Sequence, residues 1–324
     1  MATMNIIQAV NSAMSLAMKR DDSVVVLGED VGKFGGVFRA TAGLYEEFGA
    51  DRVIDTPLSE AGIIGTSIGM ALYGMRPVPE IQFADFIFPA YDHIVSELAK
   101  YRYRSGGHFS APVVIRTPFG GGIKGGLYHS QSPESLFAHI AGLKVVIPSN
   151  PYDAKGLLLS AIEDDDPIIF MEPKRVYRAA RGDVPEDYFT VPIGKAAIVN
   201  EGQDVTVVCY GAMVHTALEA VEMAAKQNIS MEVMDLRSLV PMDVDTVIES
   251  AQKTGRVVIA HEAPRTCGYG AELVAQIQER AFLYLEAPIQ RVTGLDTPFP
   301  HTLEHEYLPD AGRICDAAIA TMQF

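Results

Sequence analysis

Two series of short apolar runs, separated by helix-length segments, constrain the fold of this chain more than any other feature. Val24–Leu27 is the clearest run, because four apolar residues stand together before Gly28. Strands that are apolar at successive positions are buried on both faces, as in a parallel sheet covered by helices. The other runs are 78–81, 112–116, 144–148 and 168–171, and then 205–210, 231–236, 257–260 and 288–292. The sequence therefore predicts an α/β fold with parallel sheets.

Helices are predicted in both series. Ile6, Val10 and Met14 recur at helical spacing, so an amphipathic helix is expected over 6–18. The other predicted helices are 61–75, 86–103, 151–163, 214–225 and 271–281.

A stretch between the two series has the composition of a linker. From Pro173 to Pro192 the apolar periodicity is lost, and charge, proline and glycine gather. At about 150 residues per domain, a chain of 324 residues corresponds to roughly two domains. We expect a first domain over 1–180, a linker over 181–194, and a smaller α/β domain over 195–324.

Charge and composition exclude several classes of partner. The net charge of −15 argues against nucleic acid and anionic membrane surfaces, and favours a basic protein partner. Residues 1–18 are uncharged, but polar residues interrupt them and Lys19 and Arg20 follow them, so we expect no signal peptide. No uncharged run has the length of a membrane span. The three cysteines lack metal-ligand spacing and are expected to be reduced thiols.

One glycine cluster has the spacing of a dinucleotide-binding loop. Gly120, Gly122 and Gly125 follow a predicted strand with the G-x-G-x-x-G pattern. However, no helix pattern opens there, and no acidic residue lies about 20 positions further on. We therefore expect no nicotinamide or other dinucleotide site.

Two residues have positions suited to catalysis. Glu60 directly precedes a glycine- and alanine-rich helix pattern, where it either complements the helix dipole or exchanges a proton with a heterocycle. His129 lies between a glycine-rich loop and the helix start at Ser132, Pro133 and Glu134. A histidine at such a place is either structural or catalytic.

Eight stretches together resemble the β subunit of the thiamine-diphosphate-dependent 2-oxo acid dehydrogenases, in order from about residue 4 to the C-terminus. The Tyr-His-Ser-Gln-Ser and Asp-Thr-Pro-Phe-Pro-His stretches are more similar to the branched-chain enzyme than to the pyruvate enzyme. The eight stretches are Gly28–Val31, Gly35–Arg39, Asp55–Glu60, Glu80–Phe86, Lys100–Gly106, Tyr128–Ser132, Pro151–Gly156 and Asp296–His301.

The resemblance implies a transketolase-like pyrimidine-binding domain followed by a transketolase C-terminal domain. It also implies an α2β2 heterotetramer with thiamine diphosphate and Mg²⁺ at each α–β interface. In this family the α subunit carries a Gly-Asp-Gly motif for magnesium and diphosphate, and no Gly-Asp-Gly occurs here. We therefore expect the chain to supply half of an active site.

The resemblance also implies roles for individual residues. Glu60 matches the glutamate that hydrogen-bonds the aminopyrimidine ring nitrogen, and Leu58, Gln82 and Phe86 match positions beside that ring. Phe86 is a departure, because branched-chain relatives have tyrosine there, so a hydrogen bond from that hydroxyl is missing. His129 matches the active-site histidine that donates a proton to, or positions, the lipoyl dithiolane.

For Glu29 and for the acidic turn at 163–166, the resemblance implies a role, but a structural role fits the sequence equally well. Glu29 is expected either in an acidic relay between two active sites or as a structural carboxylate at a strand end. A potassium site is implied near Val113, Ala161, Asp164 and Asp166, where hard oxygen ligands suit the ion. The acidic run 163–166 is equally typical of a solvated helix end.

The activity implied by the resemblance requires the α subunit. It is oxidative decarboxylation of branched-chain 2-oxo acids, with transfer of the acyl group to the lipoyl group of an acyltransferase core. Pyruvate or acetoin is the alternative substrate, and a non-catalytic interaction subunit is a third interpretation. The resemblance is compatible with a cytoplasmic protein, or with the mitochondrial matrix if a transit peptide has been removed.

Overall fold

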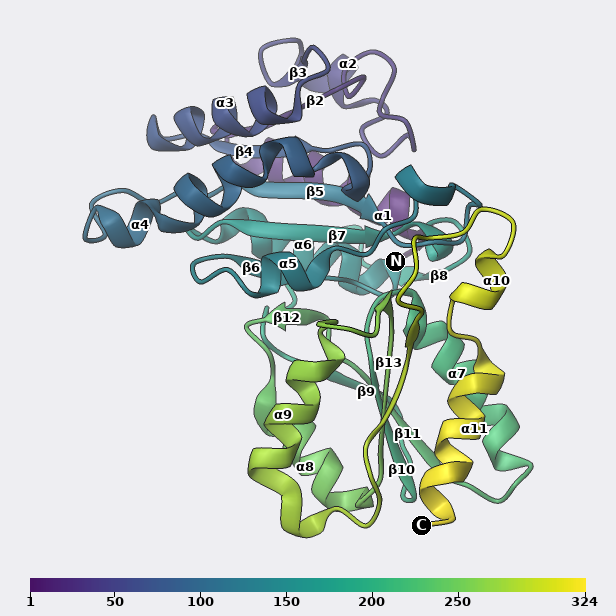
Figure 1. Ribbon diagram of the computed structural model, residues 1–324. Coiled ribbons are helices and arrows are strands. Elements are labelled where there is room, and N and C mark those ends of the chain that lie inside the picture. The colour runs from purple at the N-terminus through teal and green to yellow at the C-terminus, as the bar shows by residue number, and fades with distance from the viewer.

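The five apolar runs of the first series form strands of one seven-stranded sheet in the computed structural model, which describes residues 1–324. The other two strands, β3 and β12, are not predicted from apolar runs. The strand order is β12-β6-β7-β5-β4-β2-β3, and all neighbours are parallel except β12 and β6 (Figure 1). The predicted parallel sheet is therefore confirmed. The strands are β2 (Val24–Gly28), β3 (Val53–Asp55), β4 (Arg76–Glu80), β5 (Val114–Phe119), β6 (Lys144–Val146), β7 (Ile168–Pro173) and β12 (Ser238–Val240).

Helices cover both faces of this sheet. Helices α1 (Ile6–Arg20) and α6 (Pro151–Glu163) pack together on one face, in a core that includes Val24 and Val26. Helix α3 (Glu60–Leu72) covers the other face, in a core that includes Leu27. Shorter helices are α2 (Leu44–Phe48) and α5 (Glu134–Ala138). Adjacent strand residues thus belong to opposite cores, as the continuous apolar runs predict.

The segment 86–103, predicted as one helix, is helical without a break from Phe88 to Arg104, but it is irregularly wound. The segment consists of 3₁₀ turns at Ala84–Phe86, Phe88–Ala90 and Leu98–Lys100, a π-helical turn at His93–Glu97, and the short helix α4 (Tyr101–Arg104). Pro89 lies near the start of this segment, where it has no N–H to donate and restricts the residue before it. Apolar spacing alone does not reveal such changes in winding.

The start of the chain pairs with part of the predicted linker. Strand β1 (Ala2–Asn5) is antiparallel to β8 (Arg181–Val184), so the interval 181–194 is not wholly irregular. Asn5 then caps α1, because its side chain accepts a hydrogen bond from the Gln8 N–H and the Gln8 side chain accepts one from the Asn5 N–H. The helix predicted over 6–18 is confirmed, while the exact domain boundaries stay a prediction.

The second series forms a five-stranded sheet in the order β14-β13-β10-β11-β9, parallel except for β9. Helices α7 and α11 lie on one face, and α8 and α9 on the other (Figure 1). The elements are β9 (Ala197–Asn200), β10 (Val205–Cys209), β11 (Met231–Asp235), β13 (Val257–Pro264), β14 (Gln290–Gly294), α7 (Ala212–Ala225), α8 (Val244–Thr254), α9 (Gly270–Ala281), α10 (Glu304–Tyr307) and α11 (Ala311–Met322).

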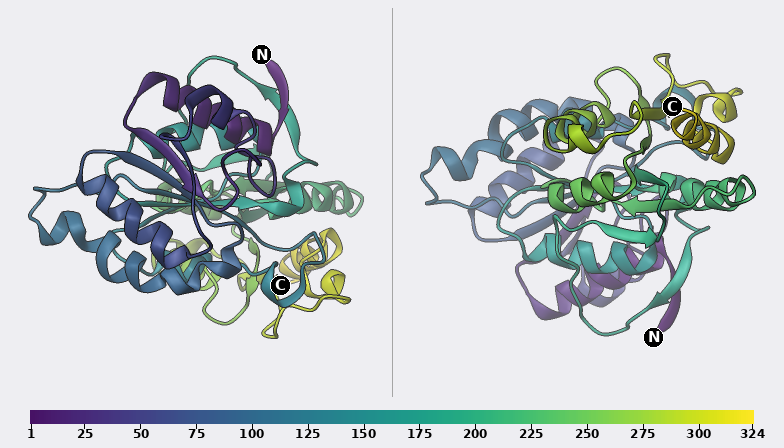
Figure 2. Two further views of the ribbon diagram at one scale, coloured as in Figure 1. Left: turned by 90° about the horizontal axis from the view of Figure 1, so that it is seen from above. Right: turned by 90° about the horizontal axis from the view of Figure 1, so that it is seen from below.

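Strand β12 joins the two halves of the molecule. It follows β11 in the chain, yet it pairs with β6 of the first sheet. Figure 2 shows the N-terminal strand and the C-terminal helix on opposite sides of the molecule. None of the helices combines the length and the apolar character that a bilayer crossing requires.

Candidate functional site

The residues predicted to act in catalysis or to bind the cofactor lie beyond the carboxyl ends of neighbouring parallel strands. Glu29 follows β2, Glu60 begins the helix after β3, and Gln82 follows β4. His129 lies beyond β5, at the end of a glycine-rich loop. Ligands of parallel α/β sheets bind at this edge. The topology therefore explains why residues from distant parts of the sequence share one edge.

Glu60 has no hydrogen-bond or ion-pair partner in this chain. Ser59 caps helix α3, because its hydroxyl oxygen accepts a hydrogen bond from the Gly62 N–H at 3.3 Å. That cap places the Glu60 side chain in the first helical turn, half-buried. Burial raises the pKa of Glu29, and the nearby charges of Glu60 and Asp30 raise it further. The carboxyl group after β2 and the one at the start of α3 are thus close enough for their charges to interact.

Gln82 contacts the turn that follows β2. Its amide nitrogen lies 3.4 Å from the carbonyl oxygen of Glu29 and 3.3 Å from a carboxylate oxygen of Asp30. These contacts hold the half-buried carboxamide of Gln82 beside the turn that carries Glu29. The edge thus combines carboxylate acceptors with an amide that both donates and accepts.

His129 lies among aromatic rings. Its ring centroid is 4.6 Å from that of Phe83 and 5.3 Å from that of Phe86, both in edge-to-face geometry. Phe86, where relatives were expected to have tyrosine, therefore packs against the histidine instead of donating a hydrogen bond. The rings restrict the orientation of a half-buried imidazole.

A buried ion cluster joins the strand ends beneath this edge. The Arg116 guanidinium on β5 donates to Glu80 on β4 at 2.9 Å and to both oxygens of Glu172 on β7, at 2.7 and 3.0 Å. All three side chains are buried. Bidentate pairing of this kind fixes geometry. The cluster therefore fixes the strand ends from which Gln82 and Lys174 continue.

Sequence reasoning did not single out Phe83, Asp85 or Lys174. Phe83 contacts His129, and Asp85 accepts hydrogen bonds from the N–H groups of Ser130 and Gln131, both at 3.1 Å. Lys174 follows β7, and its ammonium lies 5.3 Å from the centroid of the Phe83 ring. The signal that could have found Lys174 is its place directly after a buried strand, as for Glu29 and Gln82.

The edge is open on the outside. Leu58, predicted to lie beside the cofactor ring, is 79% exposed, whereas Glu29, Glu60, Gln82 and Phe86 are half-buried. This edge is therefore accessible to another molecule from the side of Leu58. No group of three His, Cys, Asp or Glu side chains is arranged to hold a metal ion.

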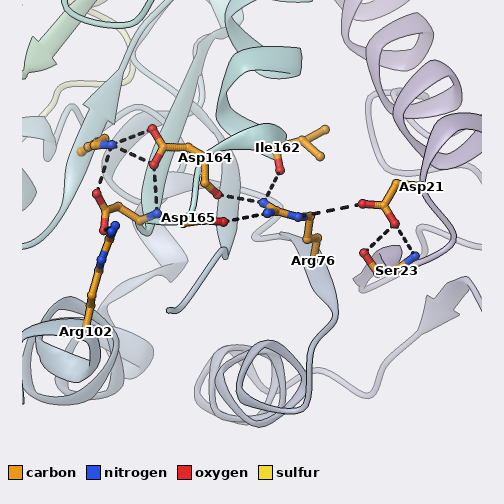
Figure 3. Close-up of polar contacts among 9 residues, drawn as sticks. Asp21, Ser23, Arg76, Arg102, Ile162, Asp164 and Asp165 are labelled. Atoms are coloured by element: carbon orange, nitrogen blue, oxygen red, sulfur yellow. Dashed lines mark hydrogen bonds and ion pairs between the residues drawn. The ribbon is translucent and has the colours of Figure 1, made fainter. Parts of the chain in front are cut away.

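The acidic turn matched to a potassium site is surrounded by cationic side chains (Figure 3). Lys144 contacts both carboxylate oxygens of Asp164, at 2.8 and 2.6 Å, and Arg102 pairs with Asp166 at 2.6 Å. Arg76 donates to the Asp164 carbonyl at 3.0 Å and pairs with Asp165 at 2.7 Å.

The carbonyl oxygens of the same site also have protein donors. Val113 accepts a hydrogen bond from the Ile168 N–H at 2.9 Å, and Ala161 accepts one from the Asp164 N–H at 3.3 Å. These residues do not form an open oxygen cradle, because an ion there would compete with Arg76 for the Asp164 carbonyl. The potassium site stays a prediction from resemblance.

Fold and site together define the chain as a transketolase-like protein. Residues 2–180 match the transketolase pyrimidine-binding domain, and residues 194–314 match the transketolase C-terminal domain. A solved structure described as a split-gene transketolase, an inactive β4 tetramer, superimposes with a TM-score of 0.79 over 99% of this chain and 98% of its own. At 23% identity, that similarity shows the fold alone.

Curated relatives identify the family to which this transketolase-like chain belongs. The chain is 58% identical to the mitochondrial 2-oxoisovalerate dehydrogenase subunit beta of Dictyostelium discoideum, over 95% of this chain and 83% of that protein. It is 53% identical to the 2-oxoisovalerate dehydrogenase subunit beta of Pseudomonas aeruginosa, over 96% and 93%. It is 50% identical to the pyruvate dehydrogenase E1 component subunit beta of Staphylococcus epidermidis, over 100% of both. The chain belongs to the family of 2-oxo acid dehydrogenase β subunits.

Proposed function

We propose that this chain is the β subunit of a branched-chain 2-oxo acid dehydrogenase and forms an active site with an α subunit. The observation that carries the proposal is the Glu60 carboxylate, which lacks a partner in the chain and lies on the same sheet edge as His129. An acid that only complements the helix dipole does not need a histidine and a carboxamide on the same edge. A carboxylate that binds a heterocycle during catalysis does need such groups beside it.

The residues at this edge suit the aminopyrimidine half of thiamine diphosphate. Glu60 would accept or share a proton at a ring nitrogen, Gln82 would donate or accept beside it, and Phe86 would pack on an apolar side. When bound, thiamine diphosphate supplies a carbon nucleophile and an electron sink for decarboxylation. The task of Glu60 is to hold the proton at the ring nitrogen, and the task of the aromatic wall is to exclude water.

An α subunit would complete the site. The exposed Leu58 marks the side from which the partner would approach, and the partner would contribute the ligands of Mg²⁺ and of the diphosphate. The proposal is supported by the relatives, which are named as beta subunits. The proposed assembly is an α2β2 heterotetramer.

His129 would act after carbon dioxide has left. Its imidazole would donate a proton to the sulfur that leaves when the lipoyl dithiolane opens, or would position that ring. The lipoyl group would be carried by an acyltransferase core that docks on the second domain. The core's docking domain is expected to be basic, and the chain's net charge of −15 is complementary to it.

Two relatives favour a branched-chain substrate and a third favours the alternative, pyruvate. The test is the steady-state rate of the reconstituted heterotetramer on 3-methyl-2-oxobutanoate and on pyruvate. We expect a higher kcat/KM for the branched-chain acid. A preference for pyruvate would be consistent with a 2-oxo acid dehydrogenase β subunit but would contradict the proposed branched-chain substrate.

The half-site part of the proposal has its own measurement. Calorimetry with thiamine diphosphate and Mg²⁺ should show tight binding to the heterotetramer and none to this chain alone. Tight binding to the chain alone would contradict the need for the α subunit.

A further inference from the structure

The loop that carries His129 is closed on itself. The Gly120 N–H donates to the Gln131 carbonyl at 3.0 Å, so the two ends of the segment 120–131 meet. Gly120, Gly122 and Lys124 all have positive φ, between 54° and 98°. Such a loop has few regular hydrogen bonds of its own, and its shape therefore depends on groups outside it.

Two carboxylates of the second domain hold this loop by its backbone. An oxygen of Glu262 on β13 accepts a hydrogen bond from the Gly121 N–H at 3.0 Å, and an oxygen of Glu304 at the start of α10 accepts one from the Lys124 N–H, also at 3.0 Å. Glu262 is 7% exposed and Glu304 is 9% exposed. A Cβ atom at Gly120 would lie 2.4 Å from a Glu262 oxygen, so the loop passes directly over this carboxylate.

A third carboxylate, from the first domain, holds the other end. Asp85 accepts from the N–H groups of Ser130 and Gln131, both at 3.1 Å, next to His129 itself. The N–H groups at both ends of the loop thus donate to buried, charged acceptors. A hydrogen bond that a carboxylate accepts is stronger than one between neutral groups.

The Lys174 ammonium lies within reach of the charges of these carboxylates and contacts the ring of Phe83. This ammonium is buried without a hydrogen-bond partner, and one oxygen each of Glu262 and Asp85 is also unpartnered. Burial lowers the pKa of Lys174 to about 8, although the charges of Asp85, Glu262 and Glu304 act in the opposite direction. The same ammonium lies over the ring of Phe83, which packs against His129.

We propose that Glu262 and Glu304 are positioning residues, through which the second domain fixes the loop that presents His129. This inference rests on the proposed function, because it assigns the second domain a part in acyl transfer to the lipoyl group. Neither carboxylate donates a proton to substrate. Each keeps the imidazole within the narrow range of positions that a proton transfer tolerates.

The test compares two assays on reconstituted heterotetramers. Glu262→Ala and Glu304→Ala should reduce transfer to the lipoyl group by roughly ten- to a hundredfold, as expected for a displaced catalytic group. Decarboxylation measured with an artificial electron acceptor should change by less than about threefold, because the loop acts after carbon dioxide is lost. Glu262→Gln should restore most of the transfer, because its amide oxygen still accepts from Gly121.

A matched control and a measurement independent of activity accompany these assays. Glu306→Ala removes an exposed carboxylate from the same helix as Glu304, and it should leave both assays unchanged. Hydrogen exchange at the amides of the segment 120–131, measured on the full chain, should speed up in Glu304→Ala and stay at the wild-type rate in Glu306→Ala. Unchanged exchange in Glu304→Ala would overturn the proposal.

A double variant separates this inference from the function on which it rests. If Glu262 acts through His129, then Glu262→Ala should reduce transfer no further when His129→Ala is already present. Wild-type transfer in Glu262→Ala and Glu304→Ala, alongside a defective His129→Ala, would overturn the positioning role alone. Wild-type transfer in His129→Ala itself would overturn the role of the histidine in the proposed function.

Discussion

At the scale of single residues, Glu60 and His129 differ in what holds them. Glu60 is placed by a helix cap next to it in the sequence, since Ser59 accepts from Gly62. His129 is placed by aromatic rings and by a loop whose anchors come from both domains. A substitution at Glu60 should therefore affect chemistry alone, whereas the function of His129 depends on distant residues.

Replacing Glu60 by glutamine tests the role of its carboxylate. Glu60→Gln should slow proton–deuterium exchange at the thiazolium carbon of thiamine diphosphate by about 10²- to 10⁴-fold, because an amide of similar size cannot share the proton of the ring nitrogen. The tetramer should stay intact. Glu272→Gln is the control, since Glu272 is also a first-turn acid, on α9. Exchange at the wild-type rate in Glu60→Gln would indicate that Glu60 only complements the dipole of helix α3.

Removing the imidazole tests when His129 acts. His129→Ala should reduce lipoyl acylation more than decarboxylation with an artificial acceptor, by at least about tenfold, because the proton is needed after carbon dioxide has left. His139→Ala, at an exposed position after α5, is the matched control. Equal losses in the two assays would assign His129 to substrate binding or to an earlier step.

At the scale of elements, α5 and the residue after β10 meet through a buried carboxyl group. Tyr210 donates a hydrogen bond to one oxygen of Glu134 at 2.8 Å, and the other oxygen has no partner. Burial raises the pKa of Glu134 to about 8. The native state therefore keeps a proton that the unfolded chain loses above pH of about 4.5.

The sign of the resulting pH dependence follows from the raised pKa. The contribution of Glu134 to stability is complete below pH of about 4.5 and is lost as the pH rises through about 8, at up to about 1.4 kcal/mol per pH unit. Between pH 5.5 and pH 7.5, the free energy of unfolding should fall less for Glu134→Gln than for the wild type, because the amide stays neutral. Urea unfolding at both pH values measures this difference. An equal pH dependence in both proteins would contradict the raised pKa of Glu134.

At the scale of the whole molecule, the exposed end of α11 would belong to the surface on which the proposed acyltransferase core docks. Phe324 is 82% exposed, just beyond α11. Thr321, by contrast, is buried, and its carbonyl accepts from Arg256 at 3.2 Å. A deletion that spares Thr321 therefore tests docking without disturbing the helix end.

Deleting residues 323–324 should weaken binding to the core's docking domain roughly two- to fivefold, because it removes the exposed side chain of Phe324 from that surface. Higher salt should weaken binding of the full chain and of the truncated chain alike, because the net charge of −15 is complementary to a basic docking domain and is the same in both. Decarboxylation by the heterotetramer should survive. Surface binding at low and high salt measures both effects, and unchanged affinity after truncation would indicate a frayed terminus.

The sequence by itself determined most of the local elements and the family. Continuous apolar runs such as Val24–Leu27 indicated buried parallel strands, because burial on both faces leaves that pattern in consecutive residues. The stretches around Glu60 and His129 indicated the family, and the family relatives agree. These features are readable because each is contained in a few neighbouring residues.

Only the tertiary structure decided how distant segments meet. Pairing of β1 with β8 and of β12 with β6 joins segments far apart in the chain, and no local pattern specifies such partners. The same holds for Glu262 and Glu304, which lie more than 100 residues beyond the loop they anchor. Their role depends on where β13 and α10 lie against the first domain. The packing of the two domains sets that position, and the identity of neighbouring residues does not.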